Sequence, residues 1–268
     1  MANTFASPRL LPSDGPAPTA LAAGFRFGEK GTHTSRTIML AELSALLAAT
    51  KPTATRKEYA EAIIEMNCLA KPTAASRRKT NQRIGELYAL DFSAPIFRVL
   101  RRLWDAENGG RPLLALQCAI ARDPLLAATM PAILSLPHGS EFSRDAMTAA
   151  VREAVGERLN ENTIAKVVRN AASSWTQSGH LSGRTFKKRQ PVVPTVASVA
   201  FALYLGHAVG FRGVDLFTSA WVALLDCSPA TARQLAIEAK RVGLIDLRMA
   251  GEVIELSLNR LDPAVSRS

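Results

Sequence analysis

The sequence predicts a mostly α-helical protein with helix-turn-helix or winged-helix elements and short β-hairpin wings. Alanine and leucine dominate the composition and aromatic residues make up only 6%, which favours helices over sheets. Apolar residues recur at helical spacing in many segments that open on a Ser, Thr or Asp cap. Two of these helical segments are followed at once by short, turn-rich stretches that can form hairpins.

Four regions are expected along the chain. Residues 1–34 are rich in Pro, Gly, Ser and Ala without periodicity, which predicts a disordered N-terminal arm. An N-terminal helix-turn-helix domain is expected at 35–110. A helical domain with a second helix-turn-helix and a basic wing is expected at 111–190, and a C-terminal helical winged-helix domain at 191–268. A chain of 268 residues with 47% hydrophobic content can bury a large core and is expected to hold two or three small domains.

The first helix-turn-helix candidate follows a helix expected at 35–49. Thr55 and Glu58 form a capping box that opens the next helix. After a short link, Thr73 is placed to cap a third helix that reaches Tyr88. Two helices joined this tightly predict a helix-turn-helix.

The helix from Thr73 to Tyr88 has a basic outward face on a helical wheel. Arginine and glutamine can bind base edges through paired hydrogen bonds, whereas lysine meets phosphate as a point charge. The outward positions are Arg78, Lys79, Gln82 and Arg83. Arg77 falls towards the packed side, so we expect it to brace a neighbouring helix. The alternative interpretation is a solvated charged face without a partner.

The middle of the chain repeats this plan after a basic amphipathic helix at 96–107 and two apolar helices at 112–121 and 124–136. Ser143 is placed to cap a helix through Val155, and a second helix follows at 162–178. The polar face of the second helix carries the candidate contacts Lys166, Arg169 and Asn170.

A turn-rich basic stretch at 179–189 stands in the position of a wing. Its cations are Arg184, Lys187, Lys188 and Arg189. Four cations within six positions repel one another unless an anion offsets them. Backbone phosphate would do so and would give sequence-independent affinity. The alternative is a mobile, solvated loop.

The C-terminal region contains a third candidate. Thr195 is placed to cap an apolar helix, and another helix is expected at 214–225. Ser228 and the proline after it open a further helix that ends at a glycine, before two short strands at 244–248 and 253–258. The inward positions of this helix are Leu235 and Val242, and the outward positions are Arg233, Gln234, Ile237 and Arg241. The alternative is a winged helix used only for packing.

The formal net charge of +10 and the pI near 10.0 indicate a polyanionic partner.

The histidines and the three cysteines lack metal-ligand spacing, and the chain contains neither a phosphate-binding loop nor a nucleophile elbow. We therefore expect no enzyme activity, no metal and no cofactor. The odd, scattered cysteines fit a reducing cytoplasm. The uncharged stretch 191–211 is interrupted by prolines and leaves about fifteen helical residues, too few to cross a bilayer.

The segment 63–73, with the sequence IIEMNCLAKPT, resembles the BrxA-like accessory proteins of bacterial BREX phage-defence systems. The resemblance includes Ser76-Arg77-Arg78 and Leu87-Tyr88 and continues through 113–136 to Ser174-Trp175 and Leu181. It implies a cytoplasmic, non-enzymatic DNA-binding protein that works beside a methyltransferase and other defence proteins. No residue roles are carried over from the family.

The sequence thus predicts a double-stranded DNA-binding protein, an accessory factor of a BREX-type system. Its alternatives are a winged-helix transcriptional regulator, a protein–protein scaffold of a multi-subunit complex, and an RNA-binding helical protein. No oligomeric state is predicted.

Overall fold

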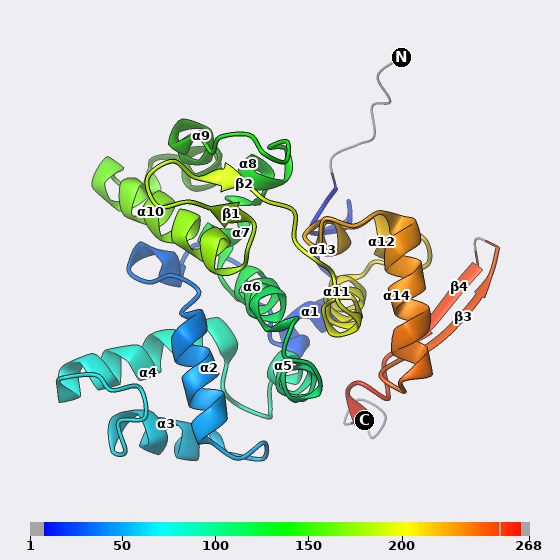
Figure 1. Ribbon diagram of the computed structural model, residues 1–268, viewed down its shortest axis with the longest axis horizontal. Coiled ribbons are helices and arrows are strands. Elements are labelled where there is room, and N and C mark those ends of the chain that lie inside the picture. Colours follow the sequence, from blue (N-terminus) through cyan, green and yellow to red (C-terminus); the bar gives the residue numbers. More distant parts are fainter. Residues whose placement is uncertain (1–7, 252, 264–268) are drawn as a thin grey trace.

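The computed structural model describes residues 8–251 and 253–263 and is mostly helical, with two small antiparallel sheets of two strands each (Figure 1). The first half contains α1 (Pro18–Ala23), η1 (Thr32–Thr34), α2 (Leu40–Ala49), α3 (Arg56–Ile64), α4 (Ala74–Tyr88), α5 (Pro95–Ala106), α6 (Arg111–Arg122), α7 (Pro124–Ala127) and α8 (Met130–Leu134). The second half contains α9 (Arg144–Val155), η2 (Gly156–Arg158), α10 (Glu161–Gln177), β1 (Leu181–Ser182), β2 (Lys188–Arg189), α11 (Val196–Val209), α12 (Asp215–Thr218), α13 (Ala220–Ala223), α14 (Pro229–Arg241), β3 (Asp246–Ala250) and β4 (Val253–Ser257).

Side-chain caps open seven of the described helices. The Thr55–Glu58 capping box is present at α3, and a second box at α4 uses Thr73. Ser143, Thr195 and Ser228 accept hydrogen bonds from the first-turn amides of α9, α11 and α14. These caps are confirmed because each bond joins groups two or three residues apart, within reach of sequence inspection.

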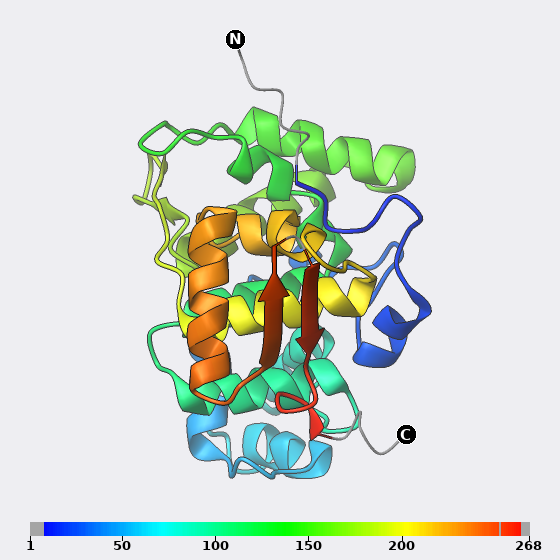
Figure 2. The ribbon, with the colours of Figure 1, turned by 90° about the vertical axis from the view of Figure 1, so that its right-hand side faces the viewer.

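The apolar helix α11 is the centre of the fold. Nearly every residue of it is buried, and it packs against α5, α6, α13 and α14. Figure 2 shows α14 and the β3–β4 hairpin covering one side of it. A helix that is apolar on all sides is stable only when it is surrounded in this way. Among the described residues no single helix is long and apolar enough to cross a membrane, and the combined stretch of α6 to α8 is bent by 108°.

The N-terminal segment does not form the disordered arm that its composition predicts. Within the described part, residues 8–34 lie against the helical core. Ala17 donates a backbone hydrogen bond to Val209 at 2.9 Å, and Ala220 donates one to Arg9 at 3.0 Å. Ala20 is fully buried in α1. Long-range contacts that composition cannot reveal therefore order this segment.

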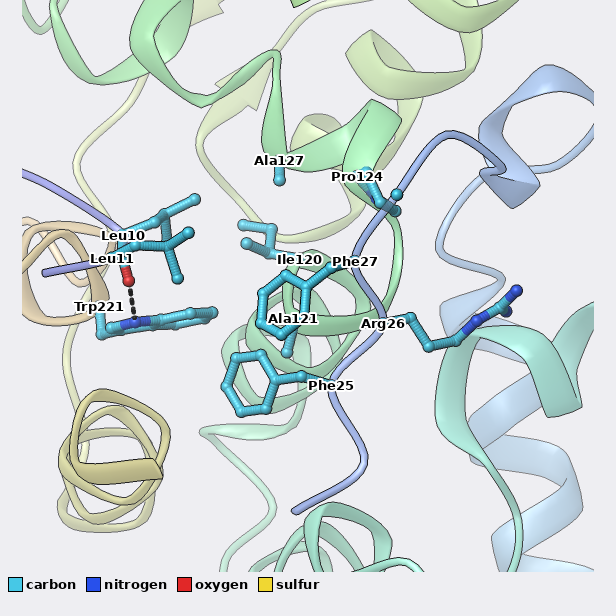
Figure 3. Close-up of a pocket in the computed structure, with 11 residues that line it drawn as sticks. Leu10, Leu11, Phe25, Arg26, Phe27, Ile120, Ala121, Pro124, Ala127 and Trp221 are labelled. Atoms are coloured by element: carbon cyan, nitrogen blue, oxygen red, sulfur yellow. Dashed lines mark hydrogen bonds between the residues drawn. The ribbon is translucent and has the colours of Figure 1, made fainter. Parts of the chain in front are cut away.

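Aromatic side chains attach the extended part of this segment to the core. Phe25 stacks on Phe27 with ring centroids 5.9 Å apart and meets Trp221 edge-on at 5.7 Å. Figure 3 shows these rings facing one pocket while Arg26 points away from it. The Arg26 guanidinium donates to the carbonyl of Glu86 in α4 at 3.3 Å. The alternation of two phenylalanines that face the pocket with an arginine that points away is that of an extended segment.

The next turn is tied down by a buried hydrogen-bonded chain. His33 Nδ1 lies 2.7 Å from Asp123 Oδ2, and His33 Nε2 lies 2.8 Å from Ser174 Oγ. Asp123 also accepts hydrogen bonds from the amides of Leu125 and Leu126 at the start of α7. The side chains of His33, Asp123 and Ser174 are all buried. The network therefore joins η1, α7 and α10.

The helix expected at 35–49 begins only at Leu40. The amide of Ile38 donates to Ser174 Oγ at 2.9 Å, and the Tyr88 hydroxyl donates to the Ile38 carbonyl. Met39 has a positive φ of 52°, which a continuous helix does not permit. Tertiary hydrogen bonds thus override the helical pattern before Leu40.

The C-terminal strands pair in register from Asp246 with Ser257 to Ala250 with Val253. The prediction that Val242 faces the core is wrong: the residue is 57% exposed and lies just after the end of α14.

Buried residues from every described region, including the N-terminal segment, form one hydrophobic cluster.

Candidate nucleic-acid interface

Helices α9 and α10 and the β1–β2 hairpin form one structural unit, shown at the upper left of Figure 1. A short extended segment before α9 pairs with strand β2 of the hairpin. Glu141 bridges Lys188, and the amide of Phe142 donates to the Lys187 carbonyl at 2.8 Å. The chain order is therefore an extended segment, two helices and a hairpin. The sequence interpretation missed this segment, because its partner lies almost fifty residues away.

Helix α10 is held by its apolar face. Ile164, Val167 and Trp175 are buried, and the Trp175 indole N–H donates to Thr129 Oγ1 at 2.8 Å. Lys166 lies on the exposed side. The division into apolar and basic faces that the sequence predicts for this helix is present.

A basic notch of about 220 Å³ lies between α10 and the hairpin loop, and Arg144, Arg169, Arg184, Lys187 and Glu141 all line it. Burial, together with the charge of Arg144, lowers the pKa of Lys187. Within the described residues the three arginines have no acidic partner. Like charges this close favour the binding of an anion.

Lys187 is less available than the arginines of the basic notch. Its Nζ donates to Thr176 Oγ1 at 2.8 Å and to the Gly183 carbonyl at 3.1 Å. Lys187 therefore fixes the loop to α10, whereas Arg184 and Lys188 are exposed. Phe186, which sequence inspection did not select, is 71% exposed in the same loop.

Arg189 is not part of the exposed surface, contrary to prediction. Its side chain is buried and ion-paired with Asp226, and its Nε donates to the Ile133 carbonyl at 3.2 Å. Successive residues of a strand point to opposite faces, so Arg189 turns inward when Lys188 turns outward. Arg189 therefore attaches the hairpin to the protein core and is unavailable to phosphate.

Asn170 is also used inside the protein. Its side-chain amide donates to the His33 carbonyl at 2.8 Å, and the residue is half-buried. Its amide group is therefore already bonded to the N-terminal segment, and contact of Asn170 with DNA stays a prediction.

The predicted surface of α4 is only partly free. Gln82 and Arg83 both bind the carboxylate of Glu86, at 3.0 and 2.7 Å. Burial raises the pKa of Glu86, but hydrogen bonds from Arg83 and Thr32 outweigh it and leave the pKa lowered. Arg78 and Lys79 are exposed and, within the described part of the chain, form no ion pair. As predicted, Arg77 braces a neighbouring helix by donating to the Ile64 carbonyl at 2.7 Å.

The predicted outward face of α14 is likewise partly occupied. Arg233 is half-buried over the ring of Phe217, with its Cζ 5.7 Å from the ring centroid, so its placement on the outward face is corrected. Arg241 is exposed but pairs with Glu238 at 2.6 Å. Gln234 is exposed. This face thus offers less unpaired charge than the basic notch.

One buried cluster contains the residue types of a catalytic triad. The Asp123–His33–Ser174 chain has the order of a hydrolase triad, but all three groups are buried and the Ser174 hydroxyl donates to the Asn170 carbonyl. Among the described residues there is no group of three or more potential metal ligands.

A second buried histidine supports the hairpin next to Arg189. His180 Nε2 lies 2.8 Å from the Leu224 carbonyl, and Nδ1 lies 2.9 Å from Ser178 Oγ. Burial lowers the pKa of His180 to about 4, with Asp226 opposing this shift and Arg189 and His138 adding to it. The imidazole is therefore neutral in the folded protein at pH 7.

This histidine makes stability pH-dependent. The unfolded chain binds the proton near pH 6.5, whereas folded His180 resists it until about pH 4. As the pH falls from about 6.5 to about 4, we expect the free energy of unfolding to decrease by up to about 1.4 kcal/mol per pH unit because of this group. His180→Gln should flatten the dependence of the unfolding free energy on pH between about pH 6.5 and pH 4, measured by urea denaturation at a series of pH values. An unchanged slope in His180→Gln would contradict the assignment.

A scan against models of known protein families finds none that matches the chain, and a search of curated proteins finds no matching relative.

Proposed function

We propose that the protein binds double-stranded DNA through the exposed face of α10 and the basic hairpin loop, in the manner of a winged helix. The succession of extended segment, α9, α10 and hairpin supports this proposal, since it is the order of elements in a winged helix. In such a unit the second helix enters the major groove and the loop lies along the backbone. Lys166 and Arg169 would then face the groove, with Arg184 and Lys188 on phosphates.

The observation that carries the proposal is the basic notch. Arg144, Arg169 and Arg184 line it from two helices and a loop, and in the described part of the chain none of the three forms an ion pair, although Glu141 lines the same notch. A protein does not gain stability from such a cluster, because its members repel one another. DNA phosphates would neutralise it and release bound counterions. The net charge of +10 would add long-range attraction.

A triple variant tests this surface. Arg169→Ala, Arg184→Ala and Lys188→Ala together should weaken binding to duplex DNA and make the log–log salt slope shallower by about one unit for each phosphate that is no longer bound. The matched control removes the same charge at scattered exposed positions: Lys51→Ala, Lys240→Ala and Arg248→Ala. Fluorescence anisotropy with duplex DNA, single-stranded DNA and RNA in parallel is the measurement.

The outcomes separate the alternatives. Loss of duplex binding in the first variant but not in the control supports the proposal, whereas equal binding by both folded variants would contradict it. Preference for RNA would favour an RNA-binding protein. A sharp preference for one short operator would favour a transcriptional regulator.

We also propose that the protein acts in the cytoplasm as an accessory factor of a BREX-type phage-defence system. The resemblance at 63–73 and beyond is the support for this role. Infection of the host with and without the gene tests it: the proposal requires weaker resistance in its absence.

A scaffold function has one observation in its favour. The C-terminal helix and hairpin expose large apolar side chains at Ile237, Val242, Met249 and Val253. Large apolar side chains that are left exposed are a feature of surfaces that bind protein partners. DNA binding and partner binding at separate surfaces are compatible with each other.

A further inference from the structure

A cavity of about 560 Å³ lies between α1, α5, α11 and the segment that follows β4. Its volume falls in the range of about 300–1,000 Å³ that is typical of small-molecule sites. Much of its lining is apolar, including Ala22, Ala208, Leu256 and Leu258. The basic notch, on the α9–α10 unit, shares no residue with it. A ligand here would not occupy the proposed DNA surface.

Two polar side chains in this cavity lack a partner in the protein. The Tyr204 hydroxyl and the His207 imidazole both line it, and among the described residues neither has a hydrogen bond. Tyr204 itself is only 6% exposed. Burial raises the pKa of Tyr204, and burial with the nearby charge of Arg212 lowers the pKa of His207 to about 4, so both groups are neutral at pH 7. Buried polar groups normally have a partner, and here a ligand can supply it.

The charges around the cavity favour an anion. Arg98 is neutralised by Asp262, to which its Nε and NH2 donate at 3.0 and 2.9 Å. Arg212 has no acidic partner within the described part of the chain. One of its nitrogens, NH1, donates to the carbonyls of His207 and Phe211 at 2.6 and 2.7 Å. Its other N–H groups remain available at the exposed rim.

We propose that this cavity binds an amphipathic monoanion, a molecule with an apolar body and a single carboxylate or sulfonate. The apolar body lies against Ala22, Ala208 and Leu256, and the anionic group meets the guanidinium of Arg212. The Tyr204 hydroxyl supplies a further hydrogen bond inside the cavity. Arginine suits this role because its planar fork pairs with carboxylate through two hydrogen bonds.

Binding can be measured without DNA. The fluorescent probe 1-anilinonaphthalene-8-sulfonate combines an aromatic body with one sulfonate, and should bind the folded protein with one molecule per chain. Octanoate, 1-octanol and octylammonium share one tail and differ in the charge of the head. Octanoate should displace the probe at the lowest concentration and should raise the melting temperature, as a ligand of the folded state does.

Variants locate the site. Arg212→Gln should weaken octanoate binding by roughly tenfold, about the free energy of one hydrogen bond to a charged group, and leave 1-octanol unchanged. Ala22→Phe, at an exposed position of α1 on the cavity wall, should block both the probe and octanoate. The matched controls are Arg144→Gln in the basic notch and Ala48→Phe on the exposed side of α2.

Equal displacement by all three octyl compounds, or unchanged probe binding in Ala22→Phe, would overturn the proposal. The result is independent of DNA binding, because the cavity and its variants lie outside the basic notch.

Discussion

Arg189→Met should destabilise the protein by about 3–5 kcal/mol, because it leaves Asp226 buried without its cation. The Arg189 guanidinium donates to Asp226 and to the carbonyls of Ile133, His180 and Gln190. These acceptors come from three separate parts of the chain that meet below the hairpin. Removal of one side chain thus breaks several long-range bonds at once. Urea denaturation followed by circular dichroism measures the change in stability.

The neighbouring residue is the control. Lys188→Met removes an exposed cation and should change stability by no more than about 0.5 kcal/mol. Asp226→Asn combined with Arg189→Met should cost less than the sum of the two single changes, since the second change removes the uncompensated charge. Asparagine also tolerates the positive φ of 51° at position 226. Additive costs in the double variant would show that the two side chains do not interact.

The contrast between Lys188 and Arg189 shows the limit of sequence inspection at this site. Counting four cations in the loop predicts a basic surface, and most of the loop provides one. Which strand residue points inward depends on the phase of a two-residue strand, and the sequence offers too few residues to establish it. The partner that selects the inward position, Asp226, lies in a different segment of the chain.

Local chemistry can be predicted where its partners are close in sequence. The Thr195 cap and the boundaries of α11 follow from hydrogen bonds within one turn, and both agree with the sequence-based expectation. The interaction of Gln82 and Arg83 with Glu86 is equally local, because residues three and four apart share a helix face. That signal is present in the sequence, and it shows that Gln82 and Arg83 already have a partner on their own helix.

The N-terminal segment shows the opposite case. Its composition predicts disorder, but Phe25 and His33 bind core residues far along the chain. The alternation of Phe25, Arg26 and Phe27 is the available local signal for an extended, packed strand. The partners of this strand, Trp221 and the Glu86 carbonyl, are fixed only by the fold.

Asp123→Ala should also destabilise the protein by about 3–5 kcal/mol, the cost of breaking a buried charged network. The carboxylate accepts from the amide and ring of His33 and from the amides of Leu125 and Leu126. Alanine leaves these donors buried without an acceptor, and each unpaired donor costs about 1–3 kcal/mol before relaxation. Because η1 and α10 meet at this network, we expect the N-terminal segment to lose hydrogen-exchange protection first.

The pH dependence distinguishes this network from simple packing. Burial raises the pKa of Asp123, but the charge and hydrogen bonds of His33 outweigh it, so the pKa lies below its usual value. Stability from this group is present above the unfolded pKa of about 3.9 and is lost as the pH falls through the folded pKa. Asp123→Asn should remove this acid-dependent part of the unfolding free energy. Asp145→Ala, at an exposed position in the first turn of α9, should cost at most about 1 kcal/mol. Equal costs for Asp123→Ala and Asp145→Ala would mean that the buried chain from Asp123 through His33 to Ser174 does not hold the N-terminal segment against α10.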